Sequence, residues 1–236
     1  LVLSPLAAAE AVIGPKQKEL GSALINIGAS TTSLAVFEEG ELLHTAVIPI
    51  GSEHITADVA IGLRCPIDLA DRIKLEYGSA MAKKFNKKEE IDISELLNED
   101  EKDNEAKTIS RKYLAEIIGA RVEEIFEKVD EELKKIDRSG MLPGGVFLIG
   151  GGTRLADIIE IAKKQLRLPA ALGMNYYMPA IIDKVNETEY LNALGLVVWG
   201  SQVSAQEGGF GKLPGSAVMD RAFKKLKGLL TNFIPK

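Results

Sequence analysis

The first segment that could do chemistry is a turn of small residues in the first part of the chain. Residues 26–33 (NIGASTTS) lie between two apolar runs and place Gly28, Ala29, Ser30 and Thr31 in the turn. Residues this small let backbone N–H groups face an anion, and the Thr31 hydroxyl can add a further hydrogen bond. The segment predicts either a phosphate-binding hairpin or an ordinary tight turn.

A second segment of this kind comes later in the chain. Residues 149–154 (IGGGTR) follow a buried apolar run and precede an amphipathic stretch. Gly150, Gly151 and Gly152 leave no side chain between the strand end and the next helix, and Thr153 follows, so a flat ligand could lie against the main chain. A packing turn explains this segment equally well. The two turns together are more specific than either one alone.

The composition limits the classes of function. With 29 Lys and Arg against 34 Asp and Glu the net charge is −5, whereas nucleic-acid binding needs a basic surface, so we expect no nucleic-acid partner. The single Cys65 cannot form an internal disulfide, and His44 and His54 form no metal-ligand cluster. No apolar run approaches the roughly 18 residues of a membrane-spanning helix. The sequence therefore predicts a globular protein that does not cross a membrane.

The elements that must position the two turns alternate between strands and helices, which predicts an α/β fold. Three Val-, Ile- and Thr-rich runs between residues 22 and 51 predict an antiparallel meander. A buried strand leads into the second turn, and residues 83–107 predict short edge strands and loop. Apolar spacings of three and four predict the helices. They are expected at 1–13, 53–63, 66–77 (ended by Gly78), 109–137, 155–166 and 190–199.

These runs, in this order and spacing, resemble the FtsA family of bacterial cell-division proteins over about residues 1–200. The resemblance implies an actin-like, RNase H-like ATPase domain with subdomains 2A and 2B, followed by an amphipathic helix. Because the chain starts at Leu1 without Met, we expect it to be the second half of a longer protein, with half of a nucleotide site. The implied parts are subdomain 2A at 1–80 and 144–200, subdomain 2B at 81–143, a flexible linker at 201–217 and a membrane-targeting helix at 218–236.

The resemblance assigns the first turn to ATP. Gly28, Ala29, Ser30 and Thr31 correspond to the hairpin that wraps the β- and γ-phosphates, with Mg²⁺ nearby. Asn26 stands where the family commonly has Asp, whose carboxylate would hold a water molecule on Mg²⁺ or orient the attacking water. An amide supplies no such charge or base. We therefore expect ATP binding with at most weak ATPase activity.

The resemblance also assigns residues to the adenosine part of ATP. Asp71 and Lys74 correspond to side chains that border the ribose and adenine, although an i,i+3 ion pair on a solvated helix face would give the same pattern. The base would lie along the backbone of the second turn. Its expected contacts are Gly150, Gly151, Gly152 and Thr153.

One residue is assigned to a protein partner. Arg121 lies in the subdomain that, by resemblance, docks the C-terminal peptide of the tubulin-like protein FtsZ, and an arginine fork can hold a peptide carboxylate. A surface salt bridge with Glu123 or Glu124 is an equally good explanation of this arginine.

The last residues predict a membrane contact. Residues 216–236 place an apolar stripe opposite a basic one, after a Gly-rich tether, which favours reversible binding to anionic lipids. A helix packed on its own domain or in a partner's groove is the alternative. The residues of the two stripes are Met219, Phe223, Leu226, Leu230 and Phe233, and Arg221, Lys224, Lys225 and Lys227.

The function implied by the resemblance is an ATP-binding protein on the inner face of the cytoplasmic membrane. It would tether the FtsZ ring to that membrane and self-assemble into filaments. A second reading is an actin-like adaptor of type IV pilus assembly similar to PilM, which has a comparable turn but normally binds a membrane partner's peptide. A third is a catalytic ATPase or kinase, which Asn26 and Ser33 oppose because both replace family carboxylates.

Overall fold

The structure is a computed structural model, and it describes residues 1–97, 107–176 and 187–207. The chain divides into two compact units, Leu1–Trp199 and Gly200–Lys236. Nearly all the described residues belong to the first unit.

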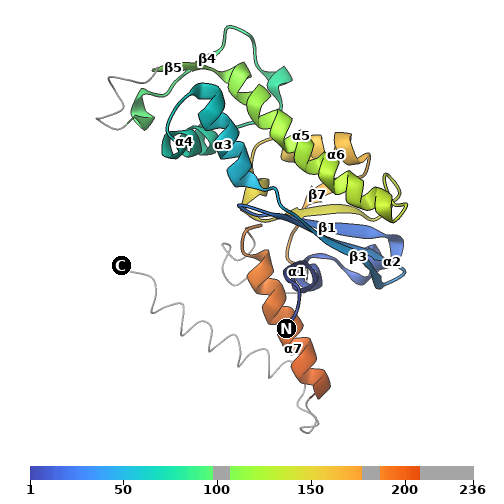
Figure 1. Ribbon diagram of the computed structural model, residues 1–236. Coiled ribbons are helices and arrows are strands. Elements are labelled where there is room, and N and C mark those ends of the chain that lie inside the picture. Colours follow the sequence, from blue (N-terminus) through green and yellow to red (C-terminus); the bar gives the residue numbers. More distant parts are fainter. Residues whose placement is uncertain (98–106, 177–186, 208–236) are drawn as a thin grey trace, which may run out of the picture. The chain divides into compact units, whose positions relative to one another are not determined.

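A five-stranded mixed sheet forms the centre of the first unit (Figure 1), with the order β3-β2-β1-β6-β7. The first three strands form the predicted antiparallel meander, while β6 pairs with β1, and β7 with β6, in parallel. The ladder therefore joins segments more than 100 residues apart in sequence. The strands are β1 (Ser22–Ile27), β2 (Thr32–Glu38), β3 (Glu41–Ile48), β6 (Gly145–Ile149) and β7 (Ala170–Leu172).

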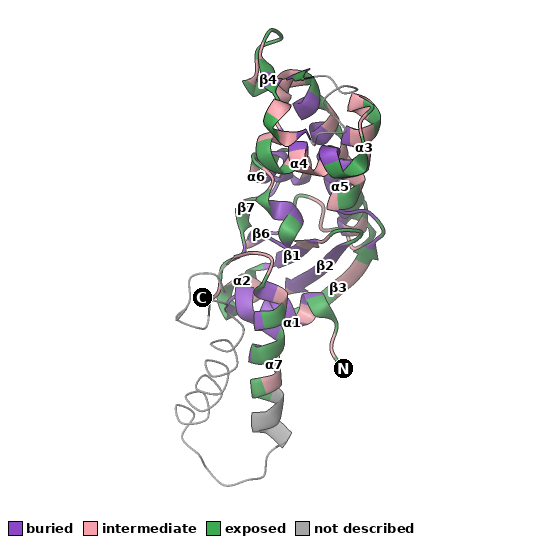
Figure 2. Cartoon of the chain, turned by 90° about the vertical axis from the view of Figure 1, so that its left-hand side faces the viewer, coloured by how far each residue is buried: buried purple, intermediate pink, exposed green. Residues whose placement is uncertain are grey.

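Both faces of the central strands are buried, which explains their nearly continuous apolar sequences. Successive residues of a strand point to opposite faces, so Ala23 and Ile25 of β1 join one core cluster while Leu24 joins the other. Strand β2 divides in the same way, with Leu34 on one side and Ala35 on the other. Figure 2 shows this buried centre of the sheet between helices.

Four helices contribute to the larger core cluster on one face of the sheet, and α5 and α6 lie directly over it (Figure 1). Helix α5 is the long amphipathic helix that the sequence predicts, and its buried residues run from Leu114 to Leu133 at spacings of three and four. It contacts both α3 and α6. The four helices are α3 (Ser52–Leu63), α4 (Ile67–Tyr77), α5 (Arg111–Lys135) and α6 (Ile158–Leu166).

The opposite face is covered by α1 (Ser4–Val12) and the first part of α7 (Leu191–Glu207). Buried alanines of α1, including Ala8, allow the helix to lie close to the sheet, and Leu191 of α7 is fully buried in the same cluster. A short helix, α2 (Pro15–Leu20), precedes β1.

The remaining elements are short. Strands β4 (Glu90–Asp92) and β5 (Thr108–Ser110) pair as a separate two-stranded ladder. Strand β4 lies within residues 83–107, where the sequence predicts edge strands, and β5 lies just beyond them. The 3₁₀ turns are η1 (Ala82–Lys84), η2 (Ser94–Leu96) and η3 (Gly151–Arg154). No helix among the described residues has the length and hydropathy needed to cross a membrane.

Several boundaries differ from the predictions. The first helix spans Ser4–Val12 within the predicted 1–13, and an unpredicted short helix, α2, follows with Pro15 in its first turn, where the missing N–H costs nothing. Ile109 belongs to β5, opposite Ile91, so the long helix starts at Arg111 with Ser110 as its N-cap. Helix α7 continues to Glu207, so the first seven residues of the predicted linker 201–217 are helical.

Candidate functional site

The two small-residue turns leave the same end of two neighbouring strands. Strands β1 and β6 are parallel and adjacent, with Asn26 opposite Ile149. The hairpin turn (residues 28–31) and the glycine loop (residues 150–154) therefore follow the carboxyl ends of these strands side by side. In α/β sheets, ligands bind outside the carboxyl ends of the strands. The fold thus brings together two segments that the sequence analysis selected independently.

The hairpin turn has open backbone N–H groups, while two of its carbonyl groups accept hydrogen bonds from the start of α3. The N–H of Ser52 donates to the Gly28 carbonyl oxygen at 2.9 Å, and the N–H of Glu53 donates to the Ala29 carbonyl oxygen at 2.8 Å. Ala29, Ser30 and Thr31 are exposed, and their N–H groups have no backbone acceptor within the part of the chain that the structure describes. Such N–H groups suit an anion.

Helix α3 begins directly behind the hairpin turn, and Gly51 permits this approach. A Cβ atom at residue 51 would lie 2.4 Å from the Ala29 carbonyl oxygen and 2.7 Å from that of Gly28. No side chain fits at these distances. The positive end of the α3 dipole therefore lies against the hairpin turn, which adds to its preference for an anion.

Glu53 is a residue of the site that the sequence analysis missed. It lies in the first turn of α3, and the Ser30 hydroxyl donates to its Oε2 at 2.7 Å. A carboxylate is thus held beside the hairpin turn. The signal in the sequence was an acidic residue at a helix start after a Gly-containing turn, a pattern too common to be decisive.

The three glycines of the glycine loop differ in their surroundings. Gly150 has φ +92°, in the region that favours glycine, and a Cβ there would lie 2.4 Å from Asn26 Oδ1. A Cβ at Gly152 would lie 2.5 Å from Ile27 Cγ2. A Cβ at Gly151 would meet no atom within 4 Å, and this residue is exposed. The loop therefore packs on β1 through Gly150 and Gly152 and offers an open backbone face at Gly151.

Thr153, expected among the nucleotide contacts, is only 3% exposed. Its hydroxyl lies 2.8 Å from the Gly150 carbonyl oxygen and 2.9 Å from Thr188 Oγ1. These internal hydrogen bonds engage the hydroxyl group. The structure thus gives Thr153 a part in holding the glycine loop in shape, and the open contact surface lies at Gly151.

Asn26, expected near Mg²⁺, turns its side-chain oxygen away from open solvent. Oδ1 is buried without a hydrogen-bond partner among the described residues, and it faces Gly150. A buried water could supply the missing hydrogen bond. The oxygen does not lie on the exposed face of the hairpin turn. The described residues also include no group of three or more His, Cys, Asp or Glu that could hold a metal ion. Glu53 is the carboxylate that the structure shows bonded to the hairpin turn.

Asp71 and Lys74 form the i,i+3 ion pair that the sequence left open, and a third residue joins them. Lys74 Nζ lies 2.7 Å from Asp71 Oδ1 and 2.5 Å from the Thr56 hydroxyl, which itself donates to Asp71 at 3.1 Å. The hydrogen bond from Lys74 lowers the pKa of Asp71. The segment after α4 lies beside the residues that follow the glycine loop, because Ala80 N donates to the Ala156 carbonyl oxygen at 3.0 Å and a Cβ at Gly78 would lie 3.0 Å from Leu155 Cδ1.

Arg121 is bound within the chain by two carboxylates. Its Nε and Nη2 donate to the two oxygens of Asp58 at 2.5 and 2.8 Å, and Nη1 donates to Glu124 at 2.6 Å. The predicted pair with Glu124 is therefore present, and the bidentate contact with Asp58 on α3 is additional. A guanidinium has five N–H donors, so about two remain for another acceptor.

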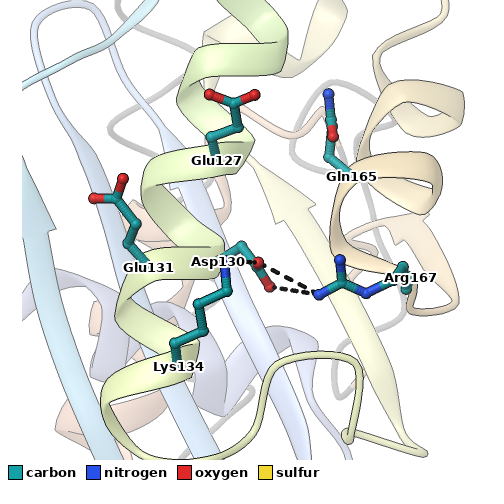
Figure 3. A pocket seen from close by; sticks show the side chains of 6 residues that line it. All are labelled: Glu127, Asp130, Glu131, Lys134, Gln165 and Arg167. Carbon is teal, nitrogen blue, oxygen red and sulfur yellow. Dashed lines mark hydrogen bonds and ion pairs between the residues drawn. The ribbon is translucent and has the colours of Figure 1, made fainter.

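Two cavities accompany these elements. One, of about 350 Å³, lies beside the glycine loop and is lined by Thr153, Arg154 and Leu155 together with residues of α6 and Leu172. The other, of about 340 Å³, lies between α5 and α6, and its lining includes the buried Asp130 and the exposed Arg167 (Figure 3). None of the predicted nucleotide-binding residues lines the second cavity. The predicted membrane-binding residues 219–233 lie outside the described residues.

Comparison with known families identifies the chain. A family model described as "Cell division protein FtsA" matches residues 23–195, which include the hairpin turn and the glycine loop. The chain belongs to the FtsA family. Among its relatives, "Cell division protein FtsA" of Pseudomonas aeruginosa is 35% identical over 202 residues, 86% of this chain and 47% of that protein. The Bacillus subtilis FtsA is 33% identical over 225 residues, 94% of this chain and 48% of that protein.

The chain spans about half the length of these curated relatives. Its fold resembles the crystal structure of MreB5 of Spiroplasma citri bound to ADP, with a TM-score of 0.66 and 18% identity, covering 88% of this chain and 62% of that one. It also resembles the PilM-PilN type IV pilus biogenesis complex, with a TM-score of 0.59 and 16% identity, covering 85% and 52%. These likenesses confirm the predicted actin-like ATPase fold.

Proposed function

We propose that this chain forms one wall of an ATP-binding cleft. The observation that carries the proposal is the adjacency of the hairpin turn and the glycine loop on parallel strands β1 and β6. The hairpin turn has open N–H groups for phosphate oxygens, and the glycine loop has an open backbone face for a flat base. MreB5, a neighbour in fold, has been crystallised with ADP and with AMPPNP, which supports the same class of ligand.

ATP fits these residues in one orientation. Its β- and γ-phosphates would face Ala29, Ser30 and Thr31, and the adenosine would lie toward Gly151 and the end of α4. Lys74 supports this orientation because its side chain is only 12% exposed and is fixed by Asp71 and Thr56, so its ammonium group is already ordered. Ordering before binding reduces the entropic cost of a contact.

The residues present favour ATP binding over hydrolysis. Mg²⁺ would neutralise phosphate charge, and Glu53 and Ser30 are the groups on this wall that could hold its water ligands. Asn26 offers no base, and its side-chain oxygen is buried against Gly150. Ser33 is 8% exposed and carries no charge. This wall therefore orders ATP with at most slow turnover, which suits a nucleotide that sets an assembly state.

A partner site on the α3–α5 surface is the second part of the proposal. The FtsZ C-terminal peptide ends in a carboxylate, and Arg121 is held at this surface with donors to spare. Asp58 acts as a brace that fixes the plane of the guanidinium. The assignment rests on the family relationship and on this donor count.

Membrane tethering and filament formation complete the proposed function. The stripe from Met219 to Phe233 and the basic residues 221–227 predict a helix that lies on anionic lipid. An FtsA-family protein with such a tail would hold the FtsZ ring at the inner face of the cytoplasmic membrane and assemble into filaments there. The alternative role in type IV pilus assembly has only fold likeness in its favour, whereas sequence relatives place the chain with FtsA.

Equilibrium titration of the natural full-length protein with ATP and Mg²⁺ tests the nucleotide proposal. We expect saturable binding in the micromolar range, about −8 kcal/mol, for a site with both phosphate and base contacts. Turnover measured in the same samples should stay low. Lack of saturation at millimolar ATP would overturn the proposal.

A further inference from the structure

We propose that Thr188 is a positioning residue of the nucleotide site, because it fixes the shape of the glycine loop. This inference rests on the proposed function, since it concerns the same site. Thr188 lies 38 residues beyond Gly150 in the sequence, yet its backbone carbonyl oxygen accepts the Gly150 N–H at 3.0 Å. Its side-chain hydroxyl contacts the carbonyl oxygen of the same glycine.

Two threonine hydroxyls converge on one carbonyl group. The Gly150 carbonyl oxygen lies 2.8 Å from Thr153 Oγ1 and 3.3 Å from Thr188 Oγ1, and the two hydroxyls are 2.9 Å apart. Each hydroxyl has one proton to donate. One hydroxyl therefore donates to the carbonyl and the other to its neighbour, so the two act as a unit.

The hydroxyl pair holds Gly150 in a backbone conformation with positive φ. Gly150 has φ +92°, and its Cα packs against Asn26 and Ile27 of β1. The Gly150 carbonyl oxygen also accepts the Thr153 N–H at 3.0 Å, so one backbone hydrogen bond and the hydroxyl pair together restrain the peptide plane between Gly150 and Gly151. Because the open face of Gly151 depends on that plane, the Thr188 hydroxyl helps to fix the surface on which a base would lie.

Thr188 also connects the glycine loop to α7, which starts three residues later. The neighbouring contact is weaker, since Arg154 donates to Glu189 at 3.1 Å but the Arg154 side chain is 65% exposed. Exposed pairs of this kind contribute little. The exposed pair therefore serves as a control for the threonine pair, because both join the same two segments.

The test compares variants of the natural full-length protein in binding two probes, ATP with Mg²⁺ and inorganic tripolyphosphate. Tripolyphosphate has no base and reports on the hairpin turn alone. We expect Thr188→Val to bind ATP about five- to tenfold more weakly, the usual effect of one lost hydrogen bond, with tripolyphosphate binding unchanged. Thr188→Ser should restore ATP binding, and Glu189→Gln should bind as the wild type does.

A double-mutant comparison tests whether the hydroxyls act together. Thr153→Val combined with Thr188→Val should weaken ATP binding no more than either change alone. Thr188→Ala, at a half-buried position, replaces Thr188→Val if the latter does not fold. Wild-type ATP affinity in a folded variant without the Thr188 hydroxyl, or equal loss of both probes, would overturn the inference. Failure of the wild type to bind either probe would instead overturn the proposed function.

Discussion

Asn26 and Gly150 face each other across the parallel strands β1 and β6, so closely that a Cβ at residue 150 would lie 2.4 Å from Asn26 Oδ1. The contact joins the hairpin turn's strand to the glycine loop. A neutral side chain suits position 26, because the glycine loop covers it and shields its oxygen from solvent. The two halves of the candidate site are thus one packed unit.

Alanine substitutions should separate the structural from the ligand-facing glycine. Gly150→Ala should lower the free energy of unfolding by about 2 kcal/mol or more, because it combines a positive φ with a backbone clash. Gly151→Ala should leave stability nearly unchanged, since its Cβ meets open space. Chemical denaturation of both variants checks this difference. Equal destabilisation by the two substitutions would contradict the described packing of the loop.

Lowering the pH should reduce the stability that the buried Asp130 contributes. Its carboxylate binds Lys134, Ser139 and Arg167 between α5 and α6 (Figure 3). Burial alone would raise the pKa of Asp130, but these hydrogen bonds and positive charges outweigh it and the pKa is lowered. The contribution to stability is therefore present above the unfolded pKa, near 4, and is lost as the pH falls through the lower folded value.

Asp130→Asn should consequently cost about 2 kcal/mol of unfolding free energy at pH 7, because a charged acceptor with three donors is lost. Urea unfolding from pH 7 to pH 3 should show the wild type losing this advantage as the acid is added. Glu131→Gln on the exposed face of α5 is the matched control, with little effect expected. A gap between wild type and Asp130→Asn that stays constant with pH would refute the assignment.

Arg121 should matter to a partner more than its neighbour Glu124 does. Arg121→Ala should reduce affinity for the FtsZ C-terminal peptide by about tenfold, as expected for a lost charge-assisted fork. Glu124→Gln removes the ion pair between Arg121 and the half-exposed Glu124 but keeps the contact of Arg121 with Asp58, so peptide binding should persist. Fluorescence anisotropy with a labelled peptide measures both. If the two variants bind the peptide equally well, the docking surface lies elsewhere.

The C-terminal stripe should control lipid binding. Lys224→Glu with Lys225→Glu should abolish co-sedimentation with vesicles of anionic phospholipid, because each basic residue near such a surface contributes about 1 kcal/mol. Lys224→Arg with Lys225→Arg keeps the charge and should still pellet. Deletion of residues 216–236 should match the charge reversal. Pelleting of the deleted form at the wild-type level would show that the tail is not the tether.

Local patterns predicted much of the fold. Alternation and β-branched runs gave the β1–β2–β3 meander, and spacings of three and four gave α3, α4 and α5, because these signals depend on neighbours along the chain. The ends were less accurate. Ile109 continues the apolar period of α5 yet pairs with Ile91 in β5, since a buried strand residue and a buried helix residue look the same in sequence.

The site was predictable in its parts but not in its connections. Glycine and hydroxyl residues mark both turns, yet the contacts of Thr188 with Gly150, of Asp58 with Arg121 and of Ser30 with Glu53 join residues 23 to 63 positions apart. No local pattern specifies such pairs. Tertiary packing also gives Thr153 a hydrogen bond within the loop, while its contact with a nucleotide stays a prediction.

The most direct test of the nucleotide wall is the ATP affinity of Ser30→Glu beside that of Ser30→Ala, in the natural full-length protein. Ser30 is exposed at the tip of the hairpin turn, and both changes remove the same exposed hydrogen bond to Glu53, so neither should disturb folding. A carboxylate there would face the phosphates and should weaken ATP binding by at least about tenfold, while Ser30→Ala should bind within about threefold of the wild type. Wild-type ATP affinity in Ser30→Glu would contradict the account.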